Sequence, residues 1–109
     1  MAKGRAAPLW VVVRDAKENA QAGLRAANYF DRMFVSMLRV AEPYRKQGIG
    51  SRLLTQAEAV ARSRGAANAY LDTFSFQAPG FYEKHGYREF ARLENLPPGH
   101  SRIWLVKRL

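Results

Sequence analysis

The chain has 109 residues, 48% of them hydrophobic, which is enough to bury one modest core; we expect a single domain over residues 1–109, with residues 1–8 flexible. It contains no cysteine, which excludes disulfides, thiolate metal sites and a cysteine nucleophile. Lysine and arginine outnumber aspartate and glutamate by 18 to 9, and the formal net charge of +9 favours an anionic partner.

Three apolar segments near the start of the chain predict strands. Residues 9–13 are rich in β-branched side chains, which favours a buried strand. Residues 20–30 follow a polar turn and are predicted to pair antiparallel with the first strand, and residues 33–40 complete the meander. Pro43 has no N–H to donate to a strand ladder, so we expect the third strand to end before it.

A helix is predicted next, from about residue 50 to residue 64, because apolar side chains recur there on one helical face. Gly65 is suited to ending it. A brief strand at residues 69–72 follows, and a strand, helix, strand unit implies parallel pairing with a right-handed crossover. The remaining predicted elements are a short helix and two closing strands, at residues 79–86, 87–94 and 101–107.

The segment between the third strand and the long helix is a tight glycine turn. The first amides of a helix lack intrahelical partners and carry the positive end of the helix dipole, so an anion can bind there. Gly48 and Gly50 have no Cβ, so the backbone can take positive φ and a phosphate can approach its N–H groups closely. Two glycines before a helix more often form an ordinary turn, and the pattern is neither a Walker loop nor a Rossmann fingerprint.

The residues around this turn resemble a family signature. Arg45-x-x-Gly48-x-Gly50 looks like the Arg/Gln-x-x-Gly-x-Gly/Ala motif of the GNAT N-acetyltransferase superfamily, whose members bind the pyrophosphate of acetyl-coenzyme A on this turn. A second segment, at residues 81–87, is similar to the family's Phe-Tyr-Glu-Lys-x-Gly-Phe/Tyr motif. The two motifs stand in the family's order, and the resemblance runs from about residue 9 to residue 109.

The resemblance implies a mixed α and β fold: a central mixed β-sheet with the order β-β-β-α-β-α-β-β. Family members usually begin with a strand and two further helices that cover one face of the sheet, and only eight residues precede the first predicted strand here. A sheet face without that cover would expose apolar surface, and a homodimer is the simplest way to bury it. We therefore expect a homodimer.

The resemblance also implies the reaction and a cofactor site. The reaction is direct transfer of acetyl from acetyl-coenzyme A to a primary amine in a ternary complex. The strand that ends at Val40 is expected to splay away from the strand at residues 70–73, and the pantetheine arm to enter that gap. There the arm is expected to pair with the backbone of Leu38 and Val40, as an added strand does. Ser75 lies where many relatives carry an asparagine that contacts the cofactor. The residues implied for the pyrophosphate are Arg45, Lys46, Gln47, Gly48, Ile49, Gly50 and Ser51.

For catalysis, Tyr82 matches the family's general acid, which protonates or hydrogen-bonds the departing thiolate. The general base is less defined. Glu42 is the first candidate, directly or through water, with Asp72 and His85 behind it. Each has a plainer interpretation: Glu42 opposes Arg45, Asp72 satisfies turn amides, and His85 is solvated near a helix end.

Two other functions are open on the sequence alone. One is a module that holds or senses coenzyme A without catalysis. The other is a basic nucleic-acid binder, which is disfavoured because the charges are spread along the chain without an arginine-rich arm or an RNA-recognition aromatic box. His85 and His100 have no metal-ligand spacing, so we expect no metal. No bilayer-length apolar run or secretory segment is recognisable, so we expect a cytoplasmic protein without a membrane partner.

Overall fold

The strands and helices follow the expected order. The computed structural model describes residues 7–14, 16–45 and 47–109. A 3₁₀ turn, η2 (Glu42–Tyr44), separates the third strand from the long helix. The strands and helices are β1 (Ala7–Arg14), β2 (Ala20–Tyr29), β3 (Arg32–Val40), α1 (Ile49–Ser63), β4 (Asn68–Phe74), α2 (Pro79–Lys84), β5 (Arg88–Glu94) and β6 (Ser101–Arg108). The predicted β-β-β-α-β-α-β-β order is confirmed.

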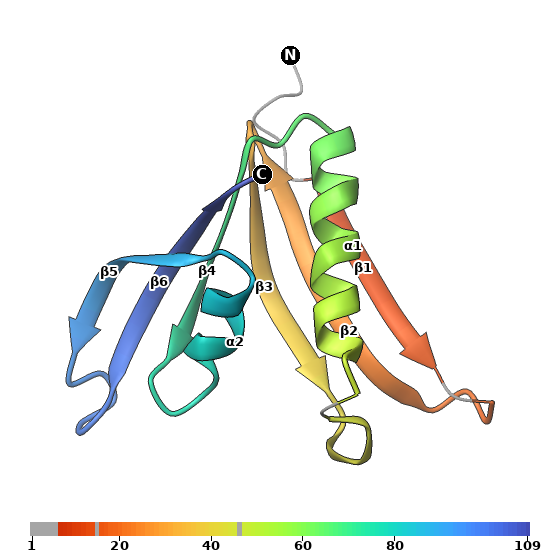
Figure 1. Cartoon of the computed structure of the whole chain (residues 1–109), viewed down its shortest axis with the longest axis horizontal. Helices are drawn as coiled ribbons and strands as arrows, with labels where there is room; N and C mark the ends of the chain where they lie inside the picture. The colour runs from red at the N-terminus through yellow and green to blue at the C-terminus, as the bar shows by residue number, and fades with distance from the viewer. Residues whose placement is uncertain (1–6, 15, 46) are drawn as a thin grey trace.

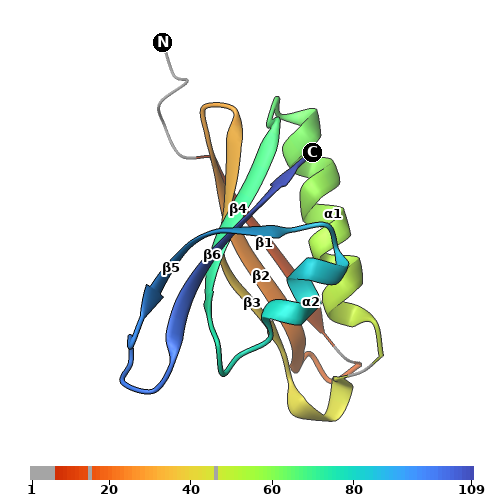
Figure 2. The ribbon, with the colours of Figure 1, turned by 60° about the vertical axis from the view of Figure 1, so that its left-hand side comes forward.

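The six strands form one mixed sheet in the order β1-β2-β3-β4-β6-β5. β1, β2 and β3 are an antiparallel meander, as predicted. β3 and β4 are parallel and are joined by α1, while β6 pairs antiparallel with both β4 and β5. Both helices lie on the same face of the sheet (Figures 1 and 2). The strand, helix, strand unit predicted from the sequence is therefore present.

β3 and β4 pair with each other over only about half of their length. Their pairing runs from Arg32 opposite Asn68 to Val35 opposite Leu71 and then stops. On the other side of β3, Arg25 pairs with Met37 and Ala26 with Val35, so one extra residue is accommodated in β3. Such a bulge bends a strand and increases its twist. The second half of β3 consequently leaves β4, which Figure 1 shows as a widening gap between the two ribbons.

The core lies between α1 and the sheet. α1 buries the stripe that the sequence predicts, including Leu53, Leu54 and Ala57. Facing it are the alternate, inward side chains of the strands, and burying each leucine contributes about 1.5–3 kcal/mol. The largest fully buried strand side chains are Leu24, Met33, Leu71 and Leu105. This core fixes α1 over β2 and β3, and so sets the position of its N-terminal turn.

The opposite face of the sheet is uncovered in the part of the chain that the structure describes. Trp10, Val12 and Tyr29 alternate with inward residues and are 62%, 46% and 42% exposed. The Arg25 guanidinium lies 5.4 Å from the centre of the Trp10 ring, in a cation–π contact. We refer to this side as the open face. No helix within the described ranges is long and apolar enough to cross a bilayer.

Candidate functional site

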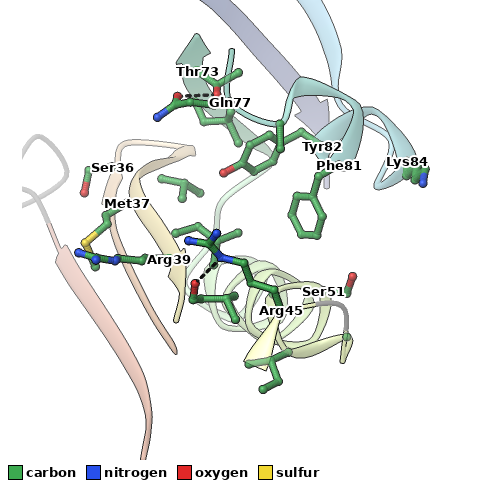
Figure 3. Close-up of a pocket in the computed structure, with 18 of the residues that line it drawn as sticks. Ser36, Met37, Arg39, Arg45, Ser51, Thr73, Gln77, Phe81, Tyr82 and Lys84 are labelled. Carbon is green, nitrogen blue, oxygen red and sulfur yellow. Dashed lines mark hydrogen bonds between the residues drawn. The ribbon is translucent and has the colours of Figure 1, made fainter. Parts of the chain in front are cut away.

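A cleft of about 910 Å³ opens where β3 and β4 diverge. Its walls come from β3, β4, the start of α1 and the segment that contains α2. Leu38 and Val40 line it from the α1 side of β3, whereas Met37 and Arg39 line it from the open face, so the cleft reaches both faces of the sheet. Figure 3 shows Tyr82, Phe81 and Arg45 gathered around it. The polar side chains in the lining are Ser36, Arg39, Tyr44, Arg45, Ser51, Asp72, Thr73, Gln77, Tyr82 and Lys84.

The edge of β3 presents backbone groups to this cleft. The Ala41 N–H donates to the Gln21 carbonyl at 2.8 Å, so that residue points its peptide groups toward β2. The direction of the peptide groups alternates from one residue to the next along a strand. The peptide groups of Val40 and Leu38 therefore point toward the cleft. The side chain of Arg45 confirms this, because its Nε donates to the Val40 carbonyl at 3.0 Å (Figure 3). A carbonyl oxygen has two lone pairs, so this contact leaves room for a second donor.

The two glycines of the turn differ in their backbone conformation and in their surroundings. Gly48 is the N-cap of α1 with φ 78°, a left-handed conformation, and a Cβ there would meet nothing within 4 Å. It is needed for its backbone conformation. A Cβ on Gly50 would lie 3.4 Å from the Phe81 ring and 3.5 Å from Val40, which are ordinary van der Waals contacts, so α2 packs directly against this position of α1.

The amides of the first turn of α1 are available at the mouth of the cleft. The Arg52 N–H makes the first helical bond, to the Gly48 carbonyl at 3.1 Å. The preceding helical amides lack helical acceptors and belong to residues that line the cleft: Ile49, Gly50 and Ser51. Together with the helix dipole and Arg45, they form a site suited to a phosphate group.

Ser51 also contacts the end of α2. Its Oγ lies 2.9 Å from Nε2 of His85, the C-cap residue of α2, and both side chains are half-buried. The Phe81 ring packs on the imidazole with 4.9 Å between ring centres. The sequence points to Ser51 and His85 separately, for different roles. No local motif places them together, because they are 34 residues apart.

Tyr82 lines the cleft from α2 and is half-buried. Its ring packs edge-on against Phe81 and Tyr87, at 5.2 and 6.0 Å between ring centres. Burial raises the pKa of the Tyr82 phenol above its usual value, and the negative charge of Asp72 raises it further. The phenol is therefore protonated at neutral pH and can donate a hydrogen bond into the cleft.

Asp72 is the one carboxylate in the cleft lining among the described residues. It accepts hydrogen bonds from Arg102, with Nε at 3.0 Å and Nη2 at 2.8 Å from the same carboxylate oxygen. The Arg102 guanidinium also lies 4.8 Å from the centre of a Trp104 ring. These contacts hold the carboxylate on the open-face side of the cleft. Glu42, in contrast, is exposed in η2 and lies outside the lining.

Most of the predicted cofactor residues meet in the cleft, with three exceptions. Gln47 is exposed and outside the lining, where its amide donates to the Pro43 carbonyl at 3.3 Å. Ser75 is also outside it, and its hydroxyl accepts the Ser101 N–H at 2.9 Å. Lys46 lies outside the described residues. Their assignments to the cofactor stay predictions.

Sequence reasoning missed several lining residues from the loop before α2. Gln77 Oε1 accepts hydrogen bonds from the Thr73 hydroxyl at 2.8 Å and from the Phe74 N–H at 2.9 Å, which fixes this loop (Figure 3). Lys84 stands in the second motif but had no assigned role, and it lines the cleft too. Periodicity carries no signal for such residues, because the loop is irregular. Within the described ranges, no group of three or more His, Asp or Glu side chains could hold a metal ion.

The arrangement combines three chemical capacities. One end of the cleft offers helix amides and cations to an anion, its β3 edge offers backbone groups to an extended chain, and its centre holds a protonated phenol near a carboxylate. This is a suitable geometry for binding a long anionic ligand and stabilising a leaving group within it.

Comparison with known proteins gives consistent similarities. The family model described as "Acetyltransferase (GNAT) domain" matches residues 5–89. Blasticidin-S acetyltransferase from Streptomyces morookaense is 44% identical over 78 residues, which cover 71% of this chain and 57% of that relative's length. The crystal structure of an acetyltransferase from Bacillus cereus has a TM-score of 0.94 and 39% identity, covering 99% of this chain and 77% of that one. An acetyltransferase from Bacillus anthracis, crystallised with acetyl coenzyme A, shares the fold with a TM-score of 0.81 at 19% identity, covering 94% of this chain and 62% of that one.

Proposed function

Because the chain belongs to the GNAT acetyltransferase family, we propose that it transfers an acetyl group from acetyl-coenzyme A to a primary amine. The observation that carries this proposal is the cleft between β3 and β4, where the α1 N-terminal turn and Tyr82 line one continuous surface. The residues present suit the co-substrate: amides and cations for its phosphates, a free strand edge for its amide-containing arm, and a phenol for its sulfur. The same fold holds acetyl coenzyme A in the Bacillus anthracis protein.

We propose the following contribution of the chain's own residues. The amides of the α1 first turn and Arg45 bind the diphosphate, and the peptide groups of Leu38 and Val40 align the pantetheine arm. The amine nitrogen then forms a bond to the acetyl carbonyl carbon while the carbon–sulfur bond breaks, and the electron pair leaves with sulfur. Tyr82 donates a hydrogen bond to that sulfur. No covalent intermediate on the enzyme is needed.

The proton of the attacking amine needs an acceptor, directly or through water. Asp72 lines the cleft and stands near the Tyr82 phenol, as its effect on the pKa of that phenol indicates. Glu42 is exposed in η2 and lies outside the lining of the cleft. We therefore propose Asp72 ahead of Glu42 as the carboxylate that orients the amine and takes up its proton.

The acceptor is proposed to be a small-molecule amine that enters from the open face. Blasticidin-S acetyltransferase is named for blasticidin S, which therefore belongs in the first acceptor panel. Polyamines are disfavoured by charge, because Arg25 and Arg39 belong to the open face and repel polycations, whereas Arg102 is paired with Asp72. An exposed amine of a protein is the alternative acceptor.

We also propose that two copies of the chain associate through the β1 and β2 part of the open face, which lies away from the cleft between β3 and β4. The support is the alternating row of large exposed side chains on β1 and β2, with Trp10 the most exposed of those named above. Exposed apolar patches of this kind mark interaction surfaces. In a homodimer the same patch meets itself across a two-fold axis.

The experiment that tests the co-substrate is a calorimetric titration with acetyl-coenzyme A. We expect saturable binding that weakens at least about tenfold in Arg45→Ala, because one charge-assisted contact is lost. Lys17→Ala removes a cation outside the cleft and serves as the matched control. Transfer is then followed as free thiol release over an amine panel. Binding without transfer to any amine would instead support a non-catalytic coenzyme A module.

A further inference from the structure

Ser51 and His85 connect the first turn of α1 to the end of α2 at the phosphate end of the cleft. We propose that His85 is a positioning residue, which turns the Ser51 hydroxyl hydrogen toward the diphosphate of coenzyme A. The inference rests on the proposed function, since it names a residue that prepares the same co-substrate site.

The geometry constrains both partners. Ser51 is in the first turn of α1 and lines the cleft, so its hydroxyl stands beside the free helix amides. His85 is the C-cap of α2, where its backbone N–H donates to the Tyr82 carbonyl at 2.9 Å. The Phe81 ring covers its imidazole at 4.9 Å. The distance of 2.9 Å between Ser51 Oγ and His85 Nε2 is thus held by fixed backbone and packing on both sides.

The chemistry of the hydroxyl decides which way this hydrogen bond must run. A hydroxyl has one hydrogen, and the oxygens of a diphosphate ester accept hydrogen bonds but do not donate them. If Ser51 donates to the imidazole, it turns a lone pair toward the phosphate, which is repulsive. If Nε2–H donates to Ser51 Oγ instead, the hydroxyl hydrogen is free to point at the phosphate. Phosphate binding therefore selects the histidine form that carries a hydrogen on Nε2.

The surroundings favour an anion at this point. Lys84 precedes His85 and lines the cleft, and Arg45 lines it from the other side of the turn. Lys107, on β6, approaches the same corner, with its Cε 3.6 Å from a Cβ placed on Gly86. Its ammonium group, however, is held by Glu58 at 2.9 Å. Ser51 thus shares the cleft lining with the cations Arg45 and Lys84, and a hydrogen-bond donor added to such a lining strengthens diphosphate binding.

The test compares two ligands in the 109-residue chain. Acetyl-coenzyme A carries the diphosphate, whereas S-acetylpantetheine lacks it. We expect His85→Leu to raise the dissociation constant for acetyl-coenzyme A about tenfold and to leave that for S-acetylpantetheine unchanged. His85→Gln should restore most of the affinity, because its side-chain amide can also donate to Ser51.

The remaining variants isolate the contact. Ser51→Ala should show the same selective loss, and the double variant should be no weaker than either single one. The matched control is His100→Leu, since His100 is the chain's other histidine and lies outside the cleft. The inference would be overturned if His85→Leu lost affinity equally for both ligands, or lost none for either. Both outcomes would leave the proposed function intact. If the wild-type chain bound neither ligand, the proposed function would fail and this inference with it.

Discussion

Tyr82 is held half-buried between two aromatic neighbours, and this environment limits what its phenol can do. Burial and the charge of Asp72 raise its pKa above the ordinary value of about 10, whereas a thiol has a pKa of about 8.5. A complete proton transfer from this phenol to a thiolate is therefore uphill. The direction of the shift favours a hydrogen bond that stabilises the sulfur as its negative charge develops.

This environment leads to a prediction for Tyr82→Phe. The ring still packs on Phe81 and Tyr87, but the donor to sulfur is lost, so kcat should fall about 100-fold. The dissociation constant of acetyl-coenzyme A should change little, because the contact forms mainly in the transition state. Steady-state kinetics and calorimetry on one preparation measure both. Tyr29→Phe, on the open face and outside the lining, is the control. Unchanged turnover in Tyr82→Phe would remove Tyr82 from the mechanism.

The glycine turn shows how far single residues can be interpreted from the sequence. The sequence predicts correctly that Gly48 and Gly50 begin a helix. It assigns a positive φ and the close approach of a phosphate to both glycines, since a lone motif cannot distinguish the two requirements. The structure separates the glycines: Gly48 adopts φ 78°, whereas Gly50 lies within α1, where a Cβ would make an ordinary contact with a ring 31 residues away. That contact depends on the tertiary fold and leaves no local signal.

At the scale of elements, a buried polar network joins α1 to the C-terminal strands. Glu58 is 3% exposed and accepts hydrogen bonds from the Tyr87 hydroxyl at 2.8 Å and from Lys107 Nζ at 2.9 Å. Helical periodicity places Glu58 near the edge of the apolar stripe, but does not reveal that it is buried. Its partners lie 29 and 49 residues away, so only the completed fold brings the three together.

This network has a pH-dependent contribution to stability. Burial, followed by the charge of Glu58, raises the pKa of Tyr87 above that of an unfolded tyrosine. The folded chain therefore retains this proton at pH values where the unfolded chain releases it. The stabilisation is fully present below pH about 10 and is lost as pH rises further.

The corresponding prediction concerns Tyr87→Phe. At pH 7 the variant should lose about 2 kcal/mol of unfolding free energy, because a hydrogen bond to a buried carboxylate is removed. Above pH 10 the difference from wild type should shrink by about 1.4 kcal/mol per pH unit. Urea denaturation at several pH values measures this. The pKa of Tyr82 is also raised, but Tyr82 is present in both proteins. Its contribution therefore cancels in the difference between their unfolding free energies. If the difference in unfolding free energy between wild type and Tyr87→Phe did not change with pH, this would contradict the proposed link between the ionisation of Tyr87 and stability.

Element order and pairing were predictable because they depend on local patterns. Apolar runs separated by polar turns identify the three strands of the meander, helical spacing identifies α1, and a crossover requires β3 and β4 to be parallel. The resemblance to the family adds the divergence of these two strands, which their four paired positions confirm. The bulge at Ser36 was not predicted, because an extra residue in one strand is defined only by its partner's register.

For the whole molecule, net charge and exposed apolar surface have opposite effects on self-association. The open face carries exposed apolar side chains that favour self-association. The formal net charge of +9 opposes it, because two like-charged copies repel each other. The same charge would attract nucleic acid. The two kinds of association therefore differ in how they respond to salt.

We predict that dimerisation strengthens as salt is raised from about 0.05 M to about 0.5 M, because screening reduces the repulsion between the copies while apolar contacts persist. Sedimentation velocity at several protein concentrations gives the dissociation constant. Trp10→Ser should weaken the dimer at every salt concentration, whereas Phe90→Ser, another exposed aromatic on the distant edge strand β5, is the matched control. Binding to nucleic acid would instead weaken steeply over the same range, because counterions released from the phosphates oppose it. A monomer at all salt concentrations, with salt-sensitive binding to DNA or RNA, would reject the dimer and favour the nucleic-acid alternative.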